Sequence, residues 1–247
     1  MNLIIDAGNT CIKLAAFKGD DPVEVCRVDY DELSKFGRFT TSYPFRRGIV
    51  SSVVDMPQSL EAAIAALPFD VVRLVPGVTP VPLRIKYATP HTLGADRLAA
   101  AVGAYAKGEG REVLVIDMGT CITYDFVNAD GEYLGGNISP GPKLRLKALN
   151  AYTSRLPLVS RHGDIPEMGD STETAIRSGV VNGIRREIEG YISDFLLKYP
   201  RLLVYLTGGV HLDLHISEKM RIFADDFILS YGLNSILEYK YLDKPLG

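Results

Sequence analysis

The sequence predicts a duplicated α/β fold, and three observations support that prediction. Each half of the 247-residue chain opens on an apolar strand that ends in Asp-x-Gly, first at Asp6 and again at Asp117. In each half two further strands follow through polar turns, and helices then alternate with strands. Apolar strands that end in Asp-x-Gly also occur in unrelated α/β proteins. Because strand, turn and three-stranded meander repeat here together, duplication of one α/β unit is the favoured interpretation.

The elements follow in a regular order along the chain. Apolar runs bounded by Gly, Pro, Asn and Asp predict strands, and longer runs rich in Ala and Leu predict helices. A Gly-rich, charged break at residues 107–111 separates the halves, which we place at residues 1–108 and 109–247. The last helix is placed either at residues 212–224 or near the C-terminus. The first half has predicted strands at residues 3–5, 11–17, 23–28, 48–53 and 71–75, with helices at 58–67 and 94–106. The second half has strands at 113–116, 121–127, 132–134 and 202–206, with helices at 143–151 and 172–197.

Composition excludes several classes of protein. The chain is 47% hydrophobic, which is typical of a globular protein, and its formal charge of −3 lacks the basic excess of a general nucleic-acid binder. No apolar run reaches the roughly 18 residues of a membrane helix, and the first residues do not resemble a signal peptide. We therefore expect a cytoplasmic protein that binds neither membranes nor nucleic acids. The three cysteines have no Cys-x-x-Cys spacing, and His211 and His215 lack further ligands, so we expect no structural metal.

Three loops carry the residues that suit a phosphate site. Residues 6–10, 117–121 and 207–209 each follow an apolar strand and are rich in Gly, Thr and Asp. Glycine lets backbone N–H groups approach an anion, and carboxylates such as those of Asp6 and Asp117 suit Mg²⁺, usually through water. Tight turns use the same residue types for geometry alone, but three such loops at strand ends favour a nucleoside triphosphate with its metal. The chain has no Gly-Lys phosphate loop, and it lacks serine-hydrolase, zinc-protease and dinucleotide-binding signatures.

A further candidate lies at the start of the helix predicted at residues 94–106. Asp96 and Arg97 occupy its first turn, where an acid is favoured by the helix dipole and an arginine is commonly solvated. Alternatively, Asp96 accepts the proton of an attacking hydroxyl and Arg97 binds an anionic substrate group through its planar fork. The spacing alone does not decide between these interpretations.

Taken together, these motifs resemble those of the type III pantothenate kinase family. The resemblance covers the whole chain and rests on four pieces: D-x-G-N-T-x-x-K from Asp6, G-x-D-R from Gly94, the long segment IDMGTCITYDFVNADGEYLGGNISPG from Ile116, and TGG from Thr207. It implies a duplicated ribonuclease-H-like fold, as in actin-like ATPases, with two mixed five-stranded sheets flanked by helices. It also implies ATP-dependent phosphorylation of pantothenate to 4′-phosphopantothenate.

The resemblance also implies roles for individual residues. Asp96 is expected to be the proton acceptor, and Asp117 to hold a monovalent cation, K⁺ or NH₄⁺. Thr120 and the first loop are expected to bind ATP with Mg²⁺. In a homodimer, Thr172 is expected to reach the substrate across the interface. The expected substrate-binding residues are Tyr87, Gly94, Ala95, Asp96, Arg97 and Thr172, and the expected ATP-binding residues are Asp6, Ala7, Gly8, Asn9, Thr10, Cys11, Ile12, Lys13 and Thr120.

Two positions depart from the family pattern, since Cys121 stands where Ala is usual and Ser171 where Asn is more frequent. Two other functions remain open from the residues alone. A kinase of the same superfamily that acts on a sugar or an acid would keep the phosphate loops but need a different acceptor pocket. A nucleotide-binding regulator would not need Asp6, Asp96, Arg97 and Asp117 together.

Overall fold

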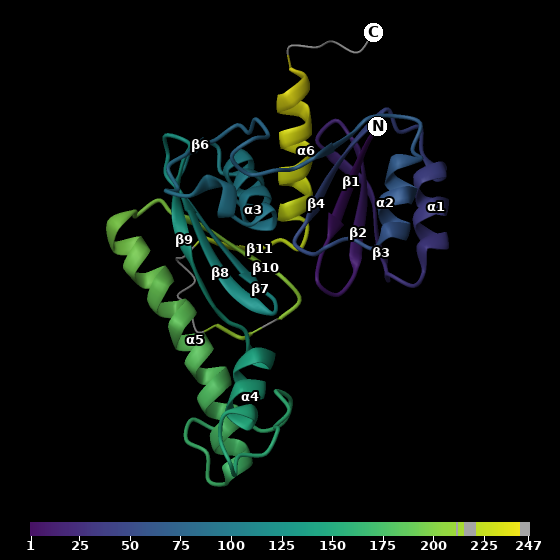
Figure 1. Cartoon of the computed structure of the whole chain (residues 1–247). Coiled ribbons are helices and arrows are strands. Elements are labelled where there is room, and N and C mark those ends of the chain that lie inside the picture. Colours follow the sequence, from purple (N-terminus) through teal and green to yellow (C-terminus); the bar gives the residue numbers. More distant parts are fainter. Residues whose placement is uncertain (211, 215–220, 243–247) are drawn as a thin grey trace. The chain divides into compact units, whose positions relative to one another are not determined.

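The computed structural model describes residues 1–210, 212–214 and 221–242, and its first sheet is formed by the N-terminal half. The strands lie in the order β3-β2-β1-β4-β5 (Figure 1). The sheet is mixed, because β1 pairs antiparallel with β2 and parallel with β4. The strands are β1 (Asn2–Ala7), β2 (Ile12–Lys18), β3 (Asp21–Val28), β4 (Arg47–Ser52) and β5 (Val71–Arg73).

The second sheet repeats this spatial order. Its strands lie in the order β11-β10-β7-β8-β9-β6. When the strands of each half are numbered in sequence order, both sheets have the spatial order 3-2-1-4-5, read from β3 to β5 in the first sheet and from β9 to β11 in the second. The sixth strand, β6, comes from the first half and pairs parallel with β9. The shared order confirms the predicted duplication. The strands are β6 (Arg84–Ile85), β7 (Val113–Met118), β8 (Cys121–Val127), β9 (Glu132–Pro140), β10 (Leu203–Thr207) and β11 (Ile222–Ala224).

Helices cover both faces of the first sheet. On one face, Leu3, Ile5 and Val50 pack with Phe36 of α1 and Leu60 of α2 in a core of apolar side chains. On the other face, α6 contacts β1 and β4, and α3 contacts β4 (Figure 1). The helices are α1 (Leu33–Ser42), α2 (Gln58–Ala65), the short 3₁₀ turn η1 (Pro90–Thr92), α3 (Ala95–Lys107), α4 (Pro142–Ala151), α5 (Thr172–Lys198) and α6 (Ile228–Tyr241).

Glycines let α3 and α6 cross at very close range. A Cβ on Gly103 would lie 2.0 Å from the Ile228 carbonyl oxygen, and one on Gly232 would lie 1.7 Å from the Ala99 carbonyl oxygen. Both distances are far below contact, so the crossing excludes any side chain at either position. The backbones of the two helices therefore pack directly against each other.

Contacts divide the chain into two compact units. Unit 1 comprises Met1–Val113, Phe126–Gly135 and Phe227–Gly247, and unit 2 comprises Leu114–Asp125 and Gly136–Asp226. The predicted halves, 1–108 and 109–247, describe the repeated fold rather than these units, and that boundary stays a prediction. Within the described ranges, no helix is both long and apolar enough to cross a membrane.

One predicted element is wrong. The helix placed at 212–224 is replaced at its end by β11, because Ile222 pairs with Val204 of β10. Residues 215–220 of that prediction lie outside the described residues. The alternative placement of the last helix near the C-terminus is confirmed by α6.

Candidate active site

The first predicted loop forms a tight turn between β1 and β2. The Gly8 N–H donates to the Cys11 carbonyl at 3.1 Å, and the Tyr30 hydroxyl donates to the Gly8 carbonyl at 2.7 Å. Burial, together with the nearby charge of Asp6, raises the pKa of Tyr30. Tyr30 therefore stays protonated and holds the turn beside Asp6, a residue that is only 6% exposed.

A row of polar side chains crosses the first sheet at Asp6. In the strand register Asp6 pairs with Lys13 on one side and with Ser51 on the other. Residues paired in this way point to the same face, and Ile5 and Val50 point to the opposite face, into the core with α1 and α2. The Ser51 hydroxyl is buried and has no hydrogen-bond partner among the described residues. This face of the sheet thus offers a carboxylate, an ammonium group and a hydroxyl side by side.

The second and third predicted loops lie together in unit 2. The Gly119 N–H donates to the Cys121 carbonyl at 2.9 Å, which closes the turn between β7 and β8. The Gly141 N–H donates to the Thr120 carbonyl at 2.9 Å, and a Cβ on Gly141 would lie 2.3 Å from the Gly119 carbonyl oxygen. The Val210 N–H donates to the Met118 carbonyl at 3.0 Å, so the loop after β10 is attached to the Asp117 loop.

The start of α3 brings Asp96 and Arg97 into a defined geometry. Gly94 is the N-cap, and a Cβ there would lie 2.6 Å from Asp96 Oδ1. That oxygen accepts the Arg97 backbone N–H at 2.8 Å. Glycine at position 94 therefore lets the half-buried Asp96 side chain fold back over the first turn of the helix, where the dipole favours its charge.

Arg97 is not the solvated arginine of the simpler interpretation, because its residue is only 6% exposed. Its Nη2 donates to the Tyr133 hydroxyl at 3.2 Å, and its guanidinium carbon lies 6.0 Å from the centroid of the Tyr87 ring. Gly135, with φ of +121°, passes the Tyr87 ring at a distance that leaves just enough room for a Cβ. The structure thus brings the predicted Tyr87 and Gly94–Arg97 together within unit 1.

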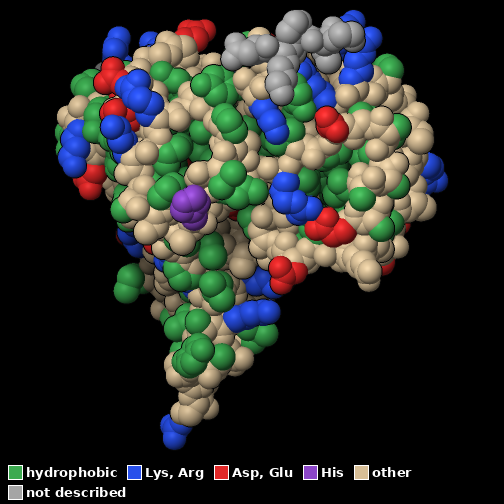
Figure 2. Space-filling view, turned by 45° about the horizontal axis from the view of Figure 1, so that its top comes forward, with side chains coloured by type: hydrophobic (Ala, Val, Ile, Leu, Met, Phe, Trp, Pro, Cys, Tyr) green, Lys and Arg blue, Asp and Glu red, His purple; other side chains and the backbone are tan. Residues whose placement is uncertain are grey.

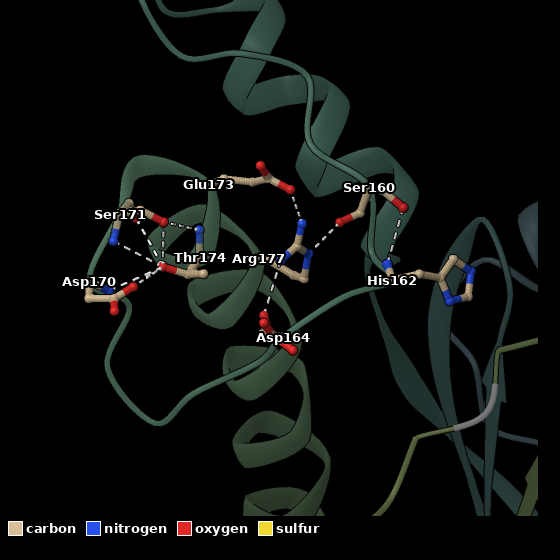
Figure 3. Close-up of polar contacts among 8 residues, drawn as sticks. All are labelled: Ser160, His162, Asp164, Asp170, Ser171, Glu173, Thr174 and Arg177. Atoms are coloured by element: carbon tan, nitrogen blue, oxygen red, sulfur yellow. Dashed lines mark hydrogen bonds and ion pairs between the residues drawn. The ribbon is translucent and has the colours of Figure 1, made fainter.

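Thr172 is the exposed first residue of α5, in unit 2. The helix begins with a capping box, in which Ser171 Oγ accepts the Thr174 N–H at 3.2 Å and Thr174 Oγ1 accepts the Ser171 N–H at 3.0 Å (Figure 3). The buried Arg177 donates to the Ser160 carbonyl at 2.9 Å and pairs with Glu173, which fastens the preceding segment to the helix (Figure 3). Ser171 therefore caps the start of α5 together with Thr174.

Sequence reasoning missed two residues of this region. Tyr133 and Ser51 were not singled out, although Tyr133 lies inside the long segment that carries the family resemblance. Among the described residues no group of three or more His, Cys, Asp or Glu side chains could hold a metal ion. The His211 and His215 pair lies outside the described residues.

Comparisons with known proteins identify relatives over nearly the whole chain. The profile of the family described as type III pantothenate kinase matches residues 2–194. A type III pantothenate kinase of Phocaeicola vulgatus is 49% identical over 239 residues, which are 97% of this chain and 98% of the relative. One of Porphyromonas gingivalis is 42% identical over 242 residues, which are 96% of this chain and 98% of the relative.

Solved structures share the fold. A Campylobacter jejuni protein assigned to the Baf family of transcriptional activators has a TM-score of 0.59 at 19% identity, with 96% of this chain and 98% of that chain covered. A Sinorhizobium meliloti protein assigned as a 2-dehydro-3-deoxygalactonokinase has a TM-score of 0.58 at 13% identity, with both chains covered to 100%. These likenesses agree with the duplicated α/β fold. By the family profile and the near full-length identity, the chain belongs to the type III pantothenate kinase family.

Proposed function

We propose that phosphoryl transfer in this kinase depends on Asp96 as proton acceptor and on Arg97 as the group that binds the substrate carboxylate. The enzyme phosphorylates pantothenate with ATP and gives 4′-phosphopantothenate, the first step of coenzyme A biosynthesis. One observation carries the proposal: a half-buried carboxylate and a buried guanidinium occupy consecutive positions at the positive end of α3.

Asp96 suits the role of proton acceptor. Its Oδ1 accepts the Arg97 N–H, which fixes the direction of the carboxyl group, and the second oxygen can accept the proton of a hydroxyl. As the pantothenate oxygen bonds to the γ-phosphorus of ATP and the bond to ADP breaks, that proton passes to Asp96. In phosphoryl transfer the protein mainly positions the reactants and neutralises charge, so one oriented carboxylate suffices.

Arg97 suits recognition of the pantothenate carboxylate. A guanidinium can donate two parallel hydrogen bonds to a carboxylate, and burial strengthens the attraction because water screens it less. The Tyr87 ring beside the guanidinium supplies an apolar surface for the uncharged part of the substrate. Gly94 and Ala95 complete the proposed pocket at the helix start.

The polar row at Asp6 fits a nucleotide and its metal ion. Mg²⁺ prefers oxygen ligands and often keeps waters that carboxylate and hydroxyl groups bind. The buried Ser51 hydroxyl has no protein partner among the described residues. Mg²⁺ would be held through water by Asp6, where it would neutralise charge on the phosphates. Lys13 and Thr120 would bind phosphate oxygens. The full proposed ATP-binding set is Asp6, Ala7, Gly8, Asn9, Thr10, Cys11, Ile12, Lys13 and Thr120.

The proposed monovalent cation, K⁺ or NH₄⁺, would bind at Asp117. The carboxylate lies half-buried at the end of β7, and the backbone around Gly208 packs against it. Carbonyl and carboxylate oxygens at a closely packed turn suit a large, weakly hydrated ion. We propose the residue as a cation ligand and not as a second catalytic acid.

We also propose that the enzyme is a cytoplasmic homodimer in which Thr172 contributes to the partner's substrate site. Unit 2 exposes several large apolar side chains, and clustered exposed apolar surface is typical of protein interfaces. Figure 2 shows hydrophobic side chains gathered at the lower end of the view. The exposed apolar residues on and after α4 include Leu144, Tyr152, Leu158 and Met168.

A substrate panel tests the proposed function. The purified chain is assayed for ADP release with ATP, Mg²⁺, K⁺ and, in turn, pantothenate, hexoses and small hydroxy acids. Phosphorylation of pantothenate alone supports the proposal. Turnover of a sugar or an acid without turnover of pantothenate would contradict it.

A further inference from the structure

We infer that Tyr133 is a positioning residue for substrate binding, because its hydroxyl holds the Arg97 guanidinium in the orientation that receives the pantothenate carboxylate. The inference rests on the proposed role of Arg97. Arg97 Nη2 lies 3.2 Å from the Tyr133 hydroxyl oxygen, which accepts its hydrogen bond. Tyr133 is 0% exposed, so the hydroxyl is fixed inside the protein and is shielded from competing water.

The two aromatic rings limit the guanidinium further. The Tyr87 and Tyr133 ring centroids lie 6.0 Å apart at an interplanar angle of 58°, and the Tyr87 ring lies beside the Arg97 guanidinium. A cation over an aromatic face is attracted by the ring's electron density. Arg97 is thus held by a ring from one side and by a hydroxyl from another.

Strand β6 explains how two tyrosines far apart in sequence come together. Ile85 pairs with Tyr133, and the Lys86 N–H donates to the Tyr133 carbonyl at 2.9 Å. This pairing places Tyr87 just beyond the end of the two-residue strand, next to the Tyr133 ring. The short pairing of β6 with β9 therefore places both tyrosines next to Arg97.

A guanidinium carries five N–H donors on a flexible stem, so an acceptor at a fixed place helps to set the direction in which those donors face. Replacement of Tyr133 by phenylalanine keeps the buried ring and removes only the acceptor. The guanidinium would then lose one of the contacts that orient it, and the substrate would have to supply that part of the ordering on binding. The loss should appear in substrate affinity rather than in the rate of the chemical step.

The test compares Tyr133→Phe with Tyr105→Phe. Tyr105 also lies on the α3 side of this region, and its hydroxyl donates to the Ala129 carbonyl over the same 3.2 Å, but it does not contact Arg97. For Tyr133→Phe we expect KM for pantothenate and its dissociation constant by calorimetry to rise about tenfold, as one hydrogen bond to a charged group allows. The KM for ATP, kcat and the melting temperature should match those of Tyr105→Phe.

A double-mutant cycle with Arg97→Lys separates this inference from the proposed function. If Tyr133 acts through Arg97, Tyr133→Phe should have no further effect on pantothenate affinity once Arg97 is lysine. An unchanged affinity in Tyr133→Phe, while Arg97→Lys binds pantothenate weakly, would overturn the inference and leave the proposed function intact. Unchanged affinity in Arg97→Lys would overturn both.

Discussion

The Asp117 carboxylate lies against the Cα of Gly208, so closely that a Cβ on Gly208 would fall 2.4 Å from Asp117 Oδ1. The same Cβ would lie 2.5 Å from the Met118 carbonyl oxygen, and Gly208 has a φ of +98°. Position 208 thus excludes a side chain for two independent reasons, contact and backbone conformation. Gly208, the first glycine after β10, is therefore part of the surroundings of Asp117.

The contact predicts that Gly208→Ala displaces the Asp117 carboxylate. We expect ATP affinity and kcat to fall at least about tenfold, because shifts of an ångström at such a site are costly. ATP affinity by calorimetry and steady-state rates measure the effect. Gly183→Ala on α5 is the control, since its Cβ would meet nothing within 4 Å. Equal behaviour of the two variants would argue against a role for the contact.

Exchange of the monovalent ion tests the proposed role of Asp117. The rate should collapse when Na⁺ replaces K⁺, since the smaller and more strongly hydrated ion does not fill the same oxygen site. Rates are measured at constant ionic strength and constant Mg²⁺. The Asp117→Asn variant should turn over at the same rate with K⁺ and with Na⁺. Equal rates with both ions in the unmodified enzyme would refute the assignment.

Asp96→Asn should remove the proton acceptor with little change in shape. We expect kcat to fall by about 10²- to 10⁴-fold, the range typical of general-base catalysis, while ATP binds with unchanged affinity. Single-turnover rates and calorimetric ATP binding check the two parts. Full turnover by the purified variant would rule out Asp96 as the base.

Acid stability should depend on Glu187. Burial opposes ionisation of this carboxyl group, but hydrogen bonds from Ser139, Arg145 and Tyr124 outweigh burial and lower its pKa below the ordinary 4.5. A lowered folded-state pKa gives stability that is present above pH 4.5 and is lost as the pH falls through the folded-state value. Melting temperatures of the unmodified protein should therefore drop on acidification.

Glu187→Gln should be less stable at neutral pH and should show a weaker decrease in melting temperature towards acid. Glu167→Gln is the matched control, because its exposed carboxylate lies 3.8 Å from Arg186 in a loose ion pair. If the melting temperatures of Glu187→Gln and of the unmodified protein fell in parallel with pH, the hydrogen bonds to Glu187 would not govern acid stability.

The α3–α6 crossing predicts a large stability effect at Gly232. A methyl group there would overlap the Ala99 carbonyl oxygen, so the helices would have to separate. We expect Gly232→Ala to cost about 3 kcal/mol or more of unfolding free energy, at the upper end of overpacking effects. Denaturant titration measures it. Gly190→Ala, with open space around its Cβ, should instead be neutral or stabilising.

Hydrophobic patterns predicted the strands and long helices well, because burial and local sequence agree there. They missed α1, whose Gly37, Thr40 and Thr41 weaken any helical signal. That helix is stabilised by burial of Phe36 and Phe39 against the first sheet. The two residues of β6 carry no pattern either, because that strand exists only through its pairing with β9. Tertiary contacts decide both elements.

At the candidate site, too, local sequence predicted some features and tertiary contacts decided the others. Spacing placed Asp96 and Arg97 in one helical turn but could not tell a solvated arginine from a buried one. The buried Arg97 donates a hydrogen bond to Tyr133, which is separated from it by 36 residues. The Ser51 hydroxyl became relevant only through its register with Asp6 across two parallel strands. Such neighbours are set by topology, which a local pattern does not record.

The position of α6 also has a consequence for the order in which the protein is made. This helix, at residues 228–241, packs on β1 and β4 of the N-terminal sheet. During synthesis β1 and β4 are therefore made long before α6, and of the two helices that pack on this face α3 is made first. The close crossing of Gly103 and Gly232 forms only once α6 has been made and packs on α3. Chains interrupted before residue 227 would leave exposed the part of the sheet on which α6 packs, and would become targets for chaperones and proteases.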